Sequence, residues 1–463
     1  MKLPKFLKFI FAFCNVVLFL HSQNALGQEL SSVELLQKLI QIDTTNPPGN
    51  EIALAQFVQQ YLKNFDIDSE ILESAPGRAN LIARIPGSGE VEPMLLLGHM
   101  DVVTADPKEW TYPPFEAHIE GPYLYGRGAI DMKGMMAMEI TSFVRLKKEK
   151  TPLKGDVLLV LAADEEAGSK FGTQFLIEKH WDKIRCRLVL TEGSIGVVQE
   201  GLHLYPIQVA EKGVAWMKLT AHGTSGHGSM PLPDNAVVIL VRVLDRLADR
   251  KQPIQKTAIV AAFLDRLAQH LPFPKSFVVR HLFTWPIRPT AQWFFSGALQ
   301  KEKVINALVR NTLVPTILQA GIKTNVIPGE ATANLDGRIL PGETPEGFKQ
   351  KVVEWIDDPT IQVELINQSL PSESPFDTPF FKVLEKSILA RDPDAIVAPY
   401  ISPGATDNRF FRAKGILSYG FIPNLIPAGD ISGMHGKNER VPVEELAKGV
   451  EILSQVIKET QGN

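Results

Sequence analysis

The spacing of apolar positions alternates between two patterns over the first part of the chain. Two stretches, 33–40 and 51–65, have helical periodicity, and the breaker Asn46-Pro47-Pro48-Gly49 separates them. Short apolar runs typical of buried strands follow at 94–97, 156–163 and 187–190, with helical stretches at 131–145 and 171–180. This alternation predicts an α/β domain with a largely parallel sheet.

The pattern changes near residue 212. Strands are expected at 213–221, 330–340 and 361–366, and helices at 236–246 and 346–355. This order suits a small α+β unit inserted into the larger domain. Helical patterns at 379–390 and 443–460 then resume the first domain.

A chain of 463 residues is longer than one core usually supports, so we expect two domains. The predicted segments are a leader at 1–27, catalytic parts at 28–211 and 371–463, and an inserted lid at 212–370. Within the lid, 252–319 is a hydrophobic insertion without a clear repeat. Its stretch 271–295 is rich in aromatics and broken by prolines, which argues against a regular helix or strand. Three interpretations of that stretch remain open. It forms a subunit interface, it packs within the lid, or part of it lines a hydrophobic channel for a long acyl chain.

The first residues resemble a secretory signal peptide. Lys2, Lys5 and Lys8 precede an apolar run at 9–20, and small residues follow at 24–27. Because the run is short for a membrane span, we expect cleavage, export to the periplasm or medium, and no stable membrane association afterwards. An uncleaved anchor is the alternative.

Charge and cysteine content exclude other classes. With 48 basic and 52 acidic residues, the chain lacks the basic excess that nucleic-acid binding favours. Cys14 lies in the leader, so Cys186 remains alone and no internal disulfide forms. Its position before an apolar run suits a buried strand residue better than a nucleophile.

Acidic and imidazole side chains follow the expected strand ends. They are His99 and Asp101, Asp131, Glu165 and Glu166, and Glu192, with His435 near the C-terminus. Each alone has an ordinary explanation, such as a helix cap for Asp131. Together they indicate metal, because clustered carboxylates repel one another without cations. Imidazole with carboxylate suits zinc, and one carboxylate can bridge two ions.

Three motifs carry a family resemblance. Residues 98–103 (GHMDVV), 125–134 (YGRGAIDMKG) and 163–166 (ADEE) resemble the aminoacylase and carboxypeptidase family of dinuclear zinc amidohydrolases, which includes succinyl-diaminopimelate desuccinylase and glutamate carboxypeptidases. Residues 110–115 resemble its vacuolar carboxypeptidase S and N-fatty-acyl amino acid hydrolase branch. The resemblance spans about 35–446. It implies a zinc-exopeptidase-like α/β domain with a mixed, mostly parallel sheet and a ferredoxin-like lid that dimerises.

The resemblance also assigns roles at the metal centre. It implies two zinc ions per chain, with manganese or cobalt as substitutes. His99 would bind one ion and His435 the other, Asp131 would bridge them, and Glu166 and Glu192 would complete the two sites. Glu165 would be the general base, and the Asp101 carboxylate would orient His99.

In the inserted unit, the motif at 223–231 resembles the family's lid motif. It implies that His227 reaches a partner subunit's site in a homodimer. Asn325 and Arg338 resemble substrate contacts, and Arg338 suits a carboxylate because guanidinium binds one bidentately. A surface salt bridge explains Arg338 equally well. Gly404 resembles the backbone loop that holds the substrate carboxylate.

The implied reaction is hydrolysis of the amide bond in N-acyl amino acids or short peptides with a free carboxylate. Zinc would acidify the attacking water, and Glu165 would take its proton. Two alternatives remain: a single-zinc aminopeptidase, which recognises a free amine, and a homologue that has lost its metals and its catalysis.

Overall fold

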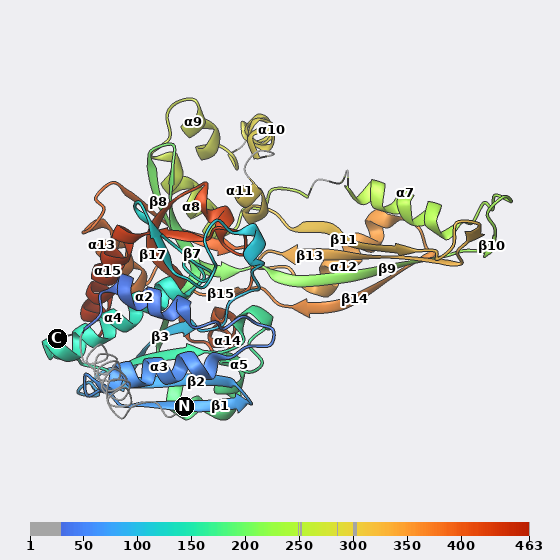
Figure 1. The fold of residues 1–463 in the computed structure, drawn as a ribbon. Helices are drawn as coiled ribbons and strands as arrows, with labels where there is room; N and C mark the ends of the chain where they lie inside the picture. Colours follow the sequence, from blue (N-terminus) through green and yellow to red (C-terminus); the bar gives the residue numbers. More distant parts are fainter. Residues whose placement is uncertain (1–28, 249, 251, 285, 300–302, 463) are drawn as a thin grey trace, which may run out of the picture. The chain divides into compact units, whose positions relative to one another are not determined.

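The computed structural model describes residues 29–462 except 249, 251, 285 and 300–302, so the expected leader lies outside the described residues. Its contacts divide the chain into two compact units (Figure 1). The first comprises Met1–Tyr205, Asp377–Ala395 and Ile416–Asn463, and the second Pro206–Phe376 and Ile396–Gly415. Residues 396–415, which the sequence analysis assigned to the second catalytic part, therefore group with the second unit.

The first unit is built on a mixed sheet. Its strands, in spatial order, are β1 (Ser69–Ala75), β2 (Arg78–Ile85), β6 (Val157–Ala162), β3 (Met94–His99), β7 (Leu188–Gln199) and β17 (Leu417–Pro427). β6, β3, β7 and β17 run parallel, and β1 and β2 form an antiparallel edge. The prediction of a mixed, mostly parallel sheet is confirmed.

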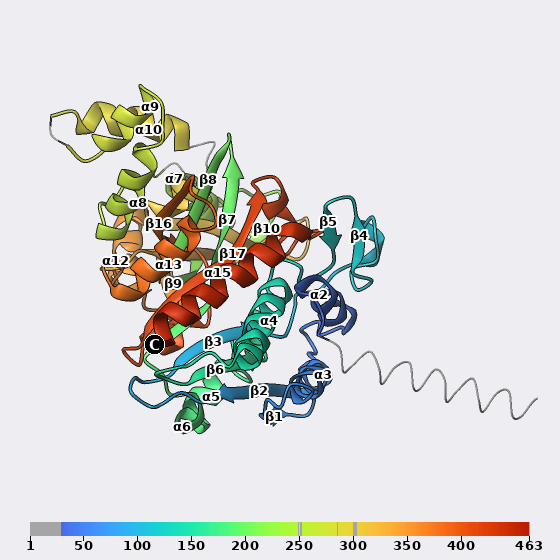
Figure 2. The ribbon, with the colours of Figure 1, turned by 90° about the vertical axis from the view of Figure 1, so that its left-hand side faces the viewer.

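Wholly apolar strands need cover on both faces. Every residue of β3 and β6 is buried. The covering helices are α2 (Ser32–Gln41), α3 (Glu51–Lys63), α4 (Lys133–Glu149), α5 (Thr173–Lys179), α6 (Trp181–Ile184), α13 (Pro379–Leu389) and α15 (Val443–Gln461). α4 packs against α15 and α2, and Figure 2 shows α4 beside α15. A small sheet of β18 (Arg440–Pro442), β5 (Tyr123–Tyr125) and β4 (His118–Glu120) completes this unit.

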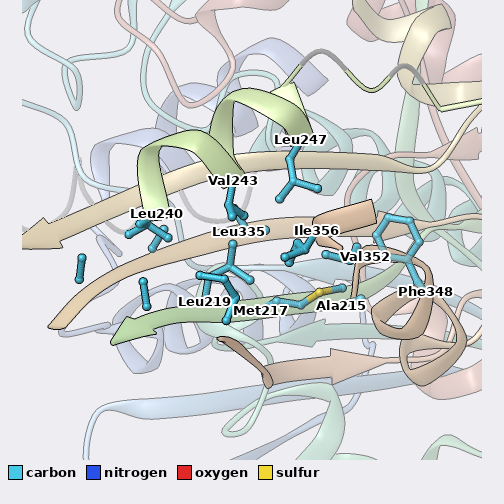
Figure 3. Close-up of a cluster of buried hydrophobic side chains, with 14 of the residues drawn as sticks. Ala215, Met217, Leu219, Leu240, Val243, Leu247, Leu335, Phe348, Val352 and Ile356 are labelled. Atoms are coloured by element: carbon cyan, nitrogen blue, oxygen red, sulfur yellow. The ribbon is translucent and has the colours of Figure 1, made fainter. Parts of the chain in front are cut away.

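The second unit contains a ferredoxin-like domain. The chain passes through β9 (Gly213–His222), α7 (Ala236–Ala248), β11 (Thr312–Ala320), β13 (Glu330–Ile339), α12 (Pro345–Ile356) and β14 (Ile361–Ser369). The antiparallel sheet has the order β11-β13-β9-β14. Alternate residues of β13 are buried, so one face is apolar, and both helices pack on that face (Figure 3). The predicted inserted α+β lid is confirmed as a fold.

Besides the ferredoxin-like domain and the helices within residues 258–308, the second unit contains further strands and one further helix. They are β8 (Leu202–Glu211), which begins in the first unit, β10 (Gly226–His227), β12 (Val326–Ile327), β15 (Ser372–Glu373), β16 (Ala395–Ser402) and α14 (Asn408–Arg412). β8 pairs with both β15 and β16.

The hydrophobic insertion is helical, contrary to the expectation for 271–295. Its helices are α8 (Ala258–Ala268), α9 (Lys275–Arg280), α10 (Arg288–Leu299) and α11 (Lys303–Leu308). The prolines do not break them, because Pro274 caps α9 and Pro289 lies in the first turn of α10, where no helical N–H bond is lost. Residues 312–319 of the expected insertion belong to β11. Among the described residues, no helix is both long enough and apolar enough to cross a membrane.

Candidate metal centre

Two clusters of imidazole and carboxylate groups lie in the first unit. One contains His99, Asp131 and Glu192, and the other contains Asp131, Glu166 and His435. In each cluster the ligand atoms lie within 4.8 Å of one another, which is close enough to share one metal ion. Asp131 belongs to both clusters, so the structure brings all five predicted ligands together.

The carboxylate of Asp131 faces both histidines. Its Oδ1 lies 3.0 Å from His99 Nε2, and its Oδ2 lies 3.0 Å from His435 Nε2. Each histidine also faces a second carboxylate. Glu192 Oε1 is 3.7 Å from His99 Nε2, and Glu166 Oε1 is 3.2 Å from His435 Nε2. This is the arrangement of two neighbouring sites with a shared carboxylate.

Two of these residues are placed differently from the sequence expectation. Asp131 follows no strand of the main sheet; it lies in the loop between β5 and α4. The cap of α4 is Met132, which makes no side-chain cap bond, so Asp131 is not the helix cap. Glu192 lies within β7 rather than beyond its end, because β7 continues into a hairpin with β8.

The electrostatics of the clusters indicate that cations are needed. Burial and the nearby Asp131 carboxylate raise the pKa of Glu192 to about 8, and burial also raises the pKa of Glu166. Hydrogen bonds to Asp131 and Glu166 raise the pKa of His435 to about 10. Without metal, protons on His435 and on Glu192 offset the negative charge of the clusters. A divalent ion at each cluster would supply the missing positive charge, so the donor set fits zinc.

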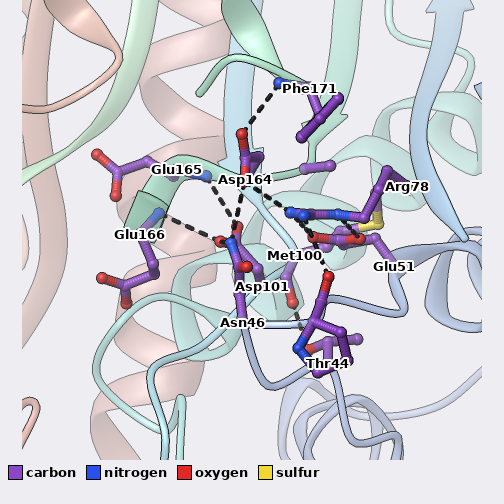
Figure 4. A network of polar contacts seen from close by, with 12 residues as sticks. Thr44, Asn46, Glu51, Arg78, Met100, Asp101, Asp164, Glu165, Glu166 and Phe171 are labelled. Atoms are coloured by element: carbon purple, nitrogen blue, oxygen red, sulfur yellow. Dashed lines mark hydrogen bonds and ion pairs between the residues drawn. The ribbon is translucent and has the colours of Figure 1, made fainter. Parts of the chain in front are cut away.

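Asp101 holds the turn that carries Glu165 and Glu166 (Figure 4). Its Oδ1 accepts the backbone N–H of Glu165 at 3.0 Å, and its Oδ2 accepts that of Glu166 at 3.1 Å. The expected contact of this carboxylate with His99 is longer, 3.6 Å to Nδ1, whereas the Asp101 carbonyl oxygen lies 2.9 Å from Nδ1. The carbonyl thus orients the imidazole, and the carboxylate fixes the turn.

A buried ion network supports the same turn. Arg78 makes two 2.8 Å contacts to Glu51 and a third 2.8 Å contact to Asp164 Oδ1. Asn46 Nδ2 donates to both Asp101 and Asp164, at 2.8 and 3.1 Å. Figure 4 shows the side chains of Glu165 and Glu166 on the side away from Arg78. The roles of Asn46, Glu51 and Arg78 were not predicted. For Glu51 and Arg78, a charged residue at the start of an apolar helix or strand was the available signal, whereas Asn46 read as part of a turn.

A second group of buried contacts, which was also not predicted, joins two loops that carry metal ligands. Glu439 is fully buried and follows His435 by four residues. Its carboxylate accepts from Ile130 N (2.7 Å), Asp131 N (3.0 Å), Gly128 N (3.0 Å) and the Arg127 guanidinium (2.6 Å). Arg127 also donates to the carbonyl of Gly436 at 2.7 Å. The loop that carries Asp131 and the loop that carries His435 are therefore fastened together.

The four expected substrate residues belong to the second unit. His227 in β10 pairs with β12, and the N–H of Gly228 donates to the carbonyl of Asn325 at 2.9 Å, so His227 and Asn325 lie together. The Arg338 guanidinium makes two contacts to Asp336, at 2.7 and 3.1 Å.

Gly404 lies between β16 and α14, and its N–H donates to Ser402 Oγ at 3.2 Å. In the first unit, Cys186 is buried, and burial raises the pKa of its thiol to about 12, which agrees with a packing role.

An α/β unit with two imidazole–carboxylate clusters around one shared aspartate defines a metallohydrolase-like protein. Residues 95–459 match the model of Peptidase family M20/M25/M40, and the chain belongs to this family of hydrolases. The predicted family is thereby confirmed.

Individual relatives agree with this family. The N-fatty-acyl-amino acid synthase/hydrolase PM20D1 of Xenopus tropicalis is 29% identical over 92% of this chain and 85% of its own length. The probable carboxypeptidase S-like 2 of Dictyostelium discoideum is 28% identical over 93% of this chain and 86% of its own length. The solved structure of an M20 family metallo-carboxypeptidase, Sso-CP2 from Sulfolobus solfataricus, has the same fold, with a TM-score of 0.67 and 20% identity over 93% of this chain and 99% of its own.

Proposed function

We propose that this chain is an exported dinuclear zinc hydrolase that cleaves the amide bond of N-acyl amino acids or short peptides with a free carboxylate. The observation that carries the proposal is the Asp131 carboxylate, whose two oxygens each face a different histidine at 3.0 Å. The relatives named for N-fatty-acyl amino acids and for carboxypeptidase activity support the substrate class.

The metal ions would be held by His99 and Glu192 on one side and by Glu166 and His435 on the other, with Asp131 shared. Bound zinc would supply Lewis acidity that lowers the pKa of water and polarises a carbonyl. Glu165 takes the proton of the attacking water and returns it to the leaving amine. Asp101 holds the backbone of Glu165, which keeps this base next to the ligand Glu166.

The second unit would bind the substrate. Arg338 and the N–H groups around Gly404 are the candidate contacts for its carboxylate, and His227 and Asn325 are the candidate donors to its carbonyl. Asp336 already pairs with Arg338 and fixes the direction of the guanidinium. The remaining guanidinium donors then suit a ligand carboxylate.

We further propose a homodimer through the exposed side of the lid. β11 is an edge strand of its sheet, and its side chains Val314, Ile317 and Leu318 are exposed. Val238 and Val241 of α7 are exposed as well. An apolar edge strand invites pairing with another strand, and a second copy of the same edge would cover it. His227 is exposed, as a residue that serves a partner subunit would be.

Export rests on the leader at residues 1–27. Sequencing the N-terminus of the protein recovered from the periplasm or medium tests this proposal. A chain that stays in the cytoplasm would contradict it.

The reaction is tested with zinc-reconstituted protein and three matched compounds: an N-acyl amino acid, the same compound with its carboxylate amidated, and the free amino acid amide. We expect turnover of the first, strong loss with the second and none with the third. Turnover of only the free-amine compound, with one zinc per chain, would favour the aminopeptidase alternative. Absence of stoichiometric zinc would favour a non-catalytic homologue. Acyl chains from acetyl to long-chain lengths then define the acyl preference.

A further inference from the structure

The helices between α7 and β11 carry an unusual charge. We call residues 252–299 the helical appendage. It contains five cations, Lys256, Arg266, Lys275, Arg280 and Arg288, and a single acidic residue, Asp265. The whole chain, by contrast, has 48 basic and 52 acidic residues. The appendage is therefore net positive within a chain whose net charge is -4.

The helical appendage also exposes large aromatic side chains. Phe273 is 81% exposed, Trp293 75% and Phe277 43%. Among the phenylalanine and tryptophan side chains whose burial the structure describes, these three are exposed. Exposed aromatics on a soluble surface indicate a contact with another molecule. Because Phe273 and Trp293 are so exposed, they do not form the buried wall that an acyl channel would need.

Two of the exposed aromatic side chains lie beside one of the cations. A hollow of about 280 Å³ is lined by Phe273, Phe277, Arg280 and His281, together with the end of α8. The rings of Phe277 and His281 stack with their centroids 4.2 Å apart. Apolar rings with a guanidinium beside them match the boundary between lipid headgroups and acyl chains.

We propose that the helical appendage docks reversibly on an anionic phospholipid surface. Phe273, Phe277 and Trp293 enter the headgroup region, while the cations pair with lipid phosphates. The net positive charge of the appendage favours an anionic lipid surface over a second copy of the appendage, because two copies would bring like charges together. The docking is peripheral, because no described helix can cross a membrane. It does not depend on the proposed reaction.

The experiment measures how much of the exported chain sediments together with lipid vesicles. Mass spectrometry first verifies the processed N-terminus of the chain. One set contains phosphatidylcholine alone and the other a large share of phosphatidylglycerol. We expect binding to the anionic vesicles only, falling as salt rises. Arg280→Gln should weaken binding about fivefold, and the double variant Phe273→Glu/Trp293→Glu at least about tenfold. Leu370→Glu is the matched control, since Leu370 is 68% exposed and lies outside the appendage.

Tryptophan fluorescence gives a second readout. Anionic vesicles should shift the emission of the wild type to the blue, and Trp293→Phe should lose most of that shift while still sedimenting. Equal binding to neutral and anionic vesicles would overturn the proposal. So would a double variant that binds as the wild type does, or a Leu370→Glu variant that loses as much binding as the double variant.

Discussion

Replacing Glu439 by glutamine tests whether the ligand loops are held in place by their buried support. Glu439 accepts four hydrogen bonds, two on each oxygen. An amide has only one acceptor oxygen, so in either orientation its NH₂ group faces two donors. Two hydrogen bonds are lost, and in either orientation the buried Arg127 loses its anionic partner because the amide is neutral.

The size of the effect follows from these contacts. An unsatisfied buried donor costs about 1–3 kcal/mol, and breaking a buried ion pair costs about 3–5 kcal/mol. We therefore expect Glu439→Gln to lower the free energy of unfolding of the metal-free protein by roughly 3–5 kcal/mol. Because Glu439 holds the N–H of Asp131, both ions should also bind more weakly, by about 10- to 100-fold.

Denaturant unfolding measures the first effect, and competition with a chelator measures the second. Glu445→Gln is the matched control: Glu445 is buried and accepts from Leu425 N at 3.0 Å and Lys448 Nζ at 2.6 Å, but it touches no ligand loop. It should lower stability and leave metal affinity unchanged. If Glu439→Gln binds both ions as tightly as the wild type, the Glu439 carboxylate does not position the metal ligands, and its proposed role is refuted.

Four further outcomes are expected. Glu165→Gln should keep two zinc ions per chain while turnover falls at least roughly 10²–10⁴-fold; near-normal turnover with full zinc would exclude Glu165 as the base. Asp131→Ala should lose both ions and melt at a lower temperature, because bound metal stabilises the folded state; two retained ions by elemental analysis would contradict the bridge. Glu139 is buried, and burial raises its pKa well above the usual value, so the folded state keeps a proton that the unfolded chain releases. Stability of the metal-free protein should therefore fall as pH rises above the ordinary glutamate pKa, and Glu139→Gln should make that fall shallower, since Glu192 and Glu166 contribute to it as well. Equal slopes of unfolding free energy against pH for the two proteins, from pH 5 to 8, would refute it. The double variant Leu318→Glu/Val241→Glu should be monomeric by light scattering, and an unchanged mass would place the dimer contact elsewhere.

The strongly patterned elements were predictable from sequence. β3 and β6 are short apolar runs that end at chemistry-bearing residues, and α2, α3 and α15 begin and end close to their predicted bounds. Three strands and both helices of the inserted unit were predictable because each shows a clear period. Its fourth strand, β11, was missed, since it has no buried residue and was assigned to the hydrophobic insertion. The β1–β2 hairpin was missed, since β1 has no buried residue and its pattern is neither alternating nor continuous.

The candidate ligands could be named from the pattern of acidic and imidazole residues, and their separate roles came from the family motifs. The residues that support them were not predictable. Arg127 and Glu439 are 312 residues apart, and Asn46 and Asp164 are 118 apart. No local period records such a pairing, because each residue looks like an ordinary surface charge or turn residue until the fold buries it. The bridging position of Asp131 came only from the family resemblance, since no local pattern records where separate loops meet.

The supports share one property that explains how the site can be both rigid and ready to bind metal. Glu439 holds the backbone N–H of Asp131, and Asp101 holds the backbone N–H groups of Glu165 and Glu166. These contacts fix the loops through the main chain and do not consume the ligand oxygens. The ligand carboxylates then face one another and the two histidines, and burial together with the nearby Asp131 carboxylate raises the pKa of Glu192 to about 8. A site held in this way is costly without cations and well ordered with them, which is what preorganised metal binding requires.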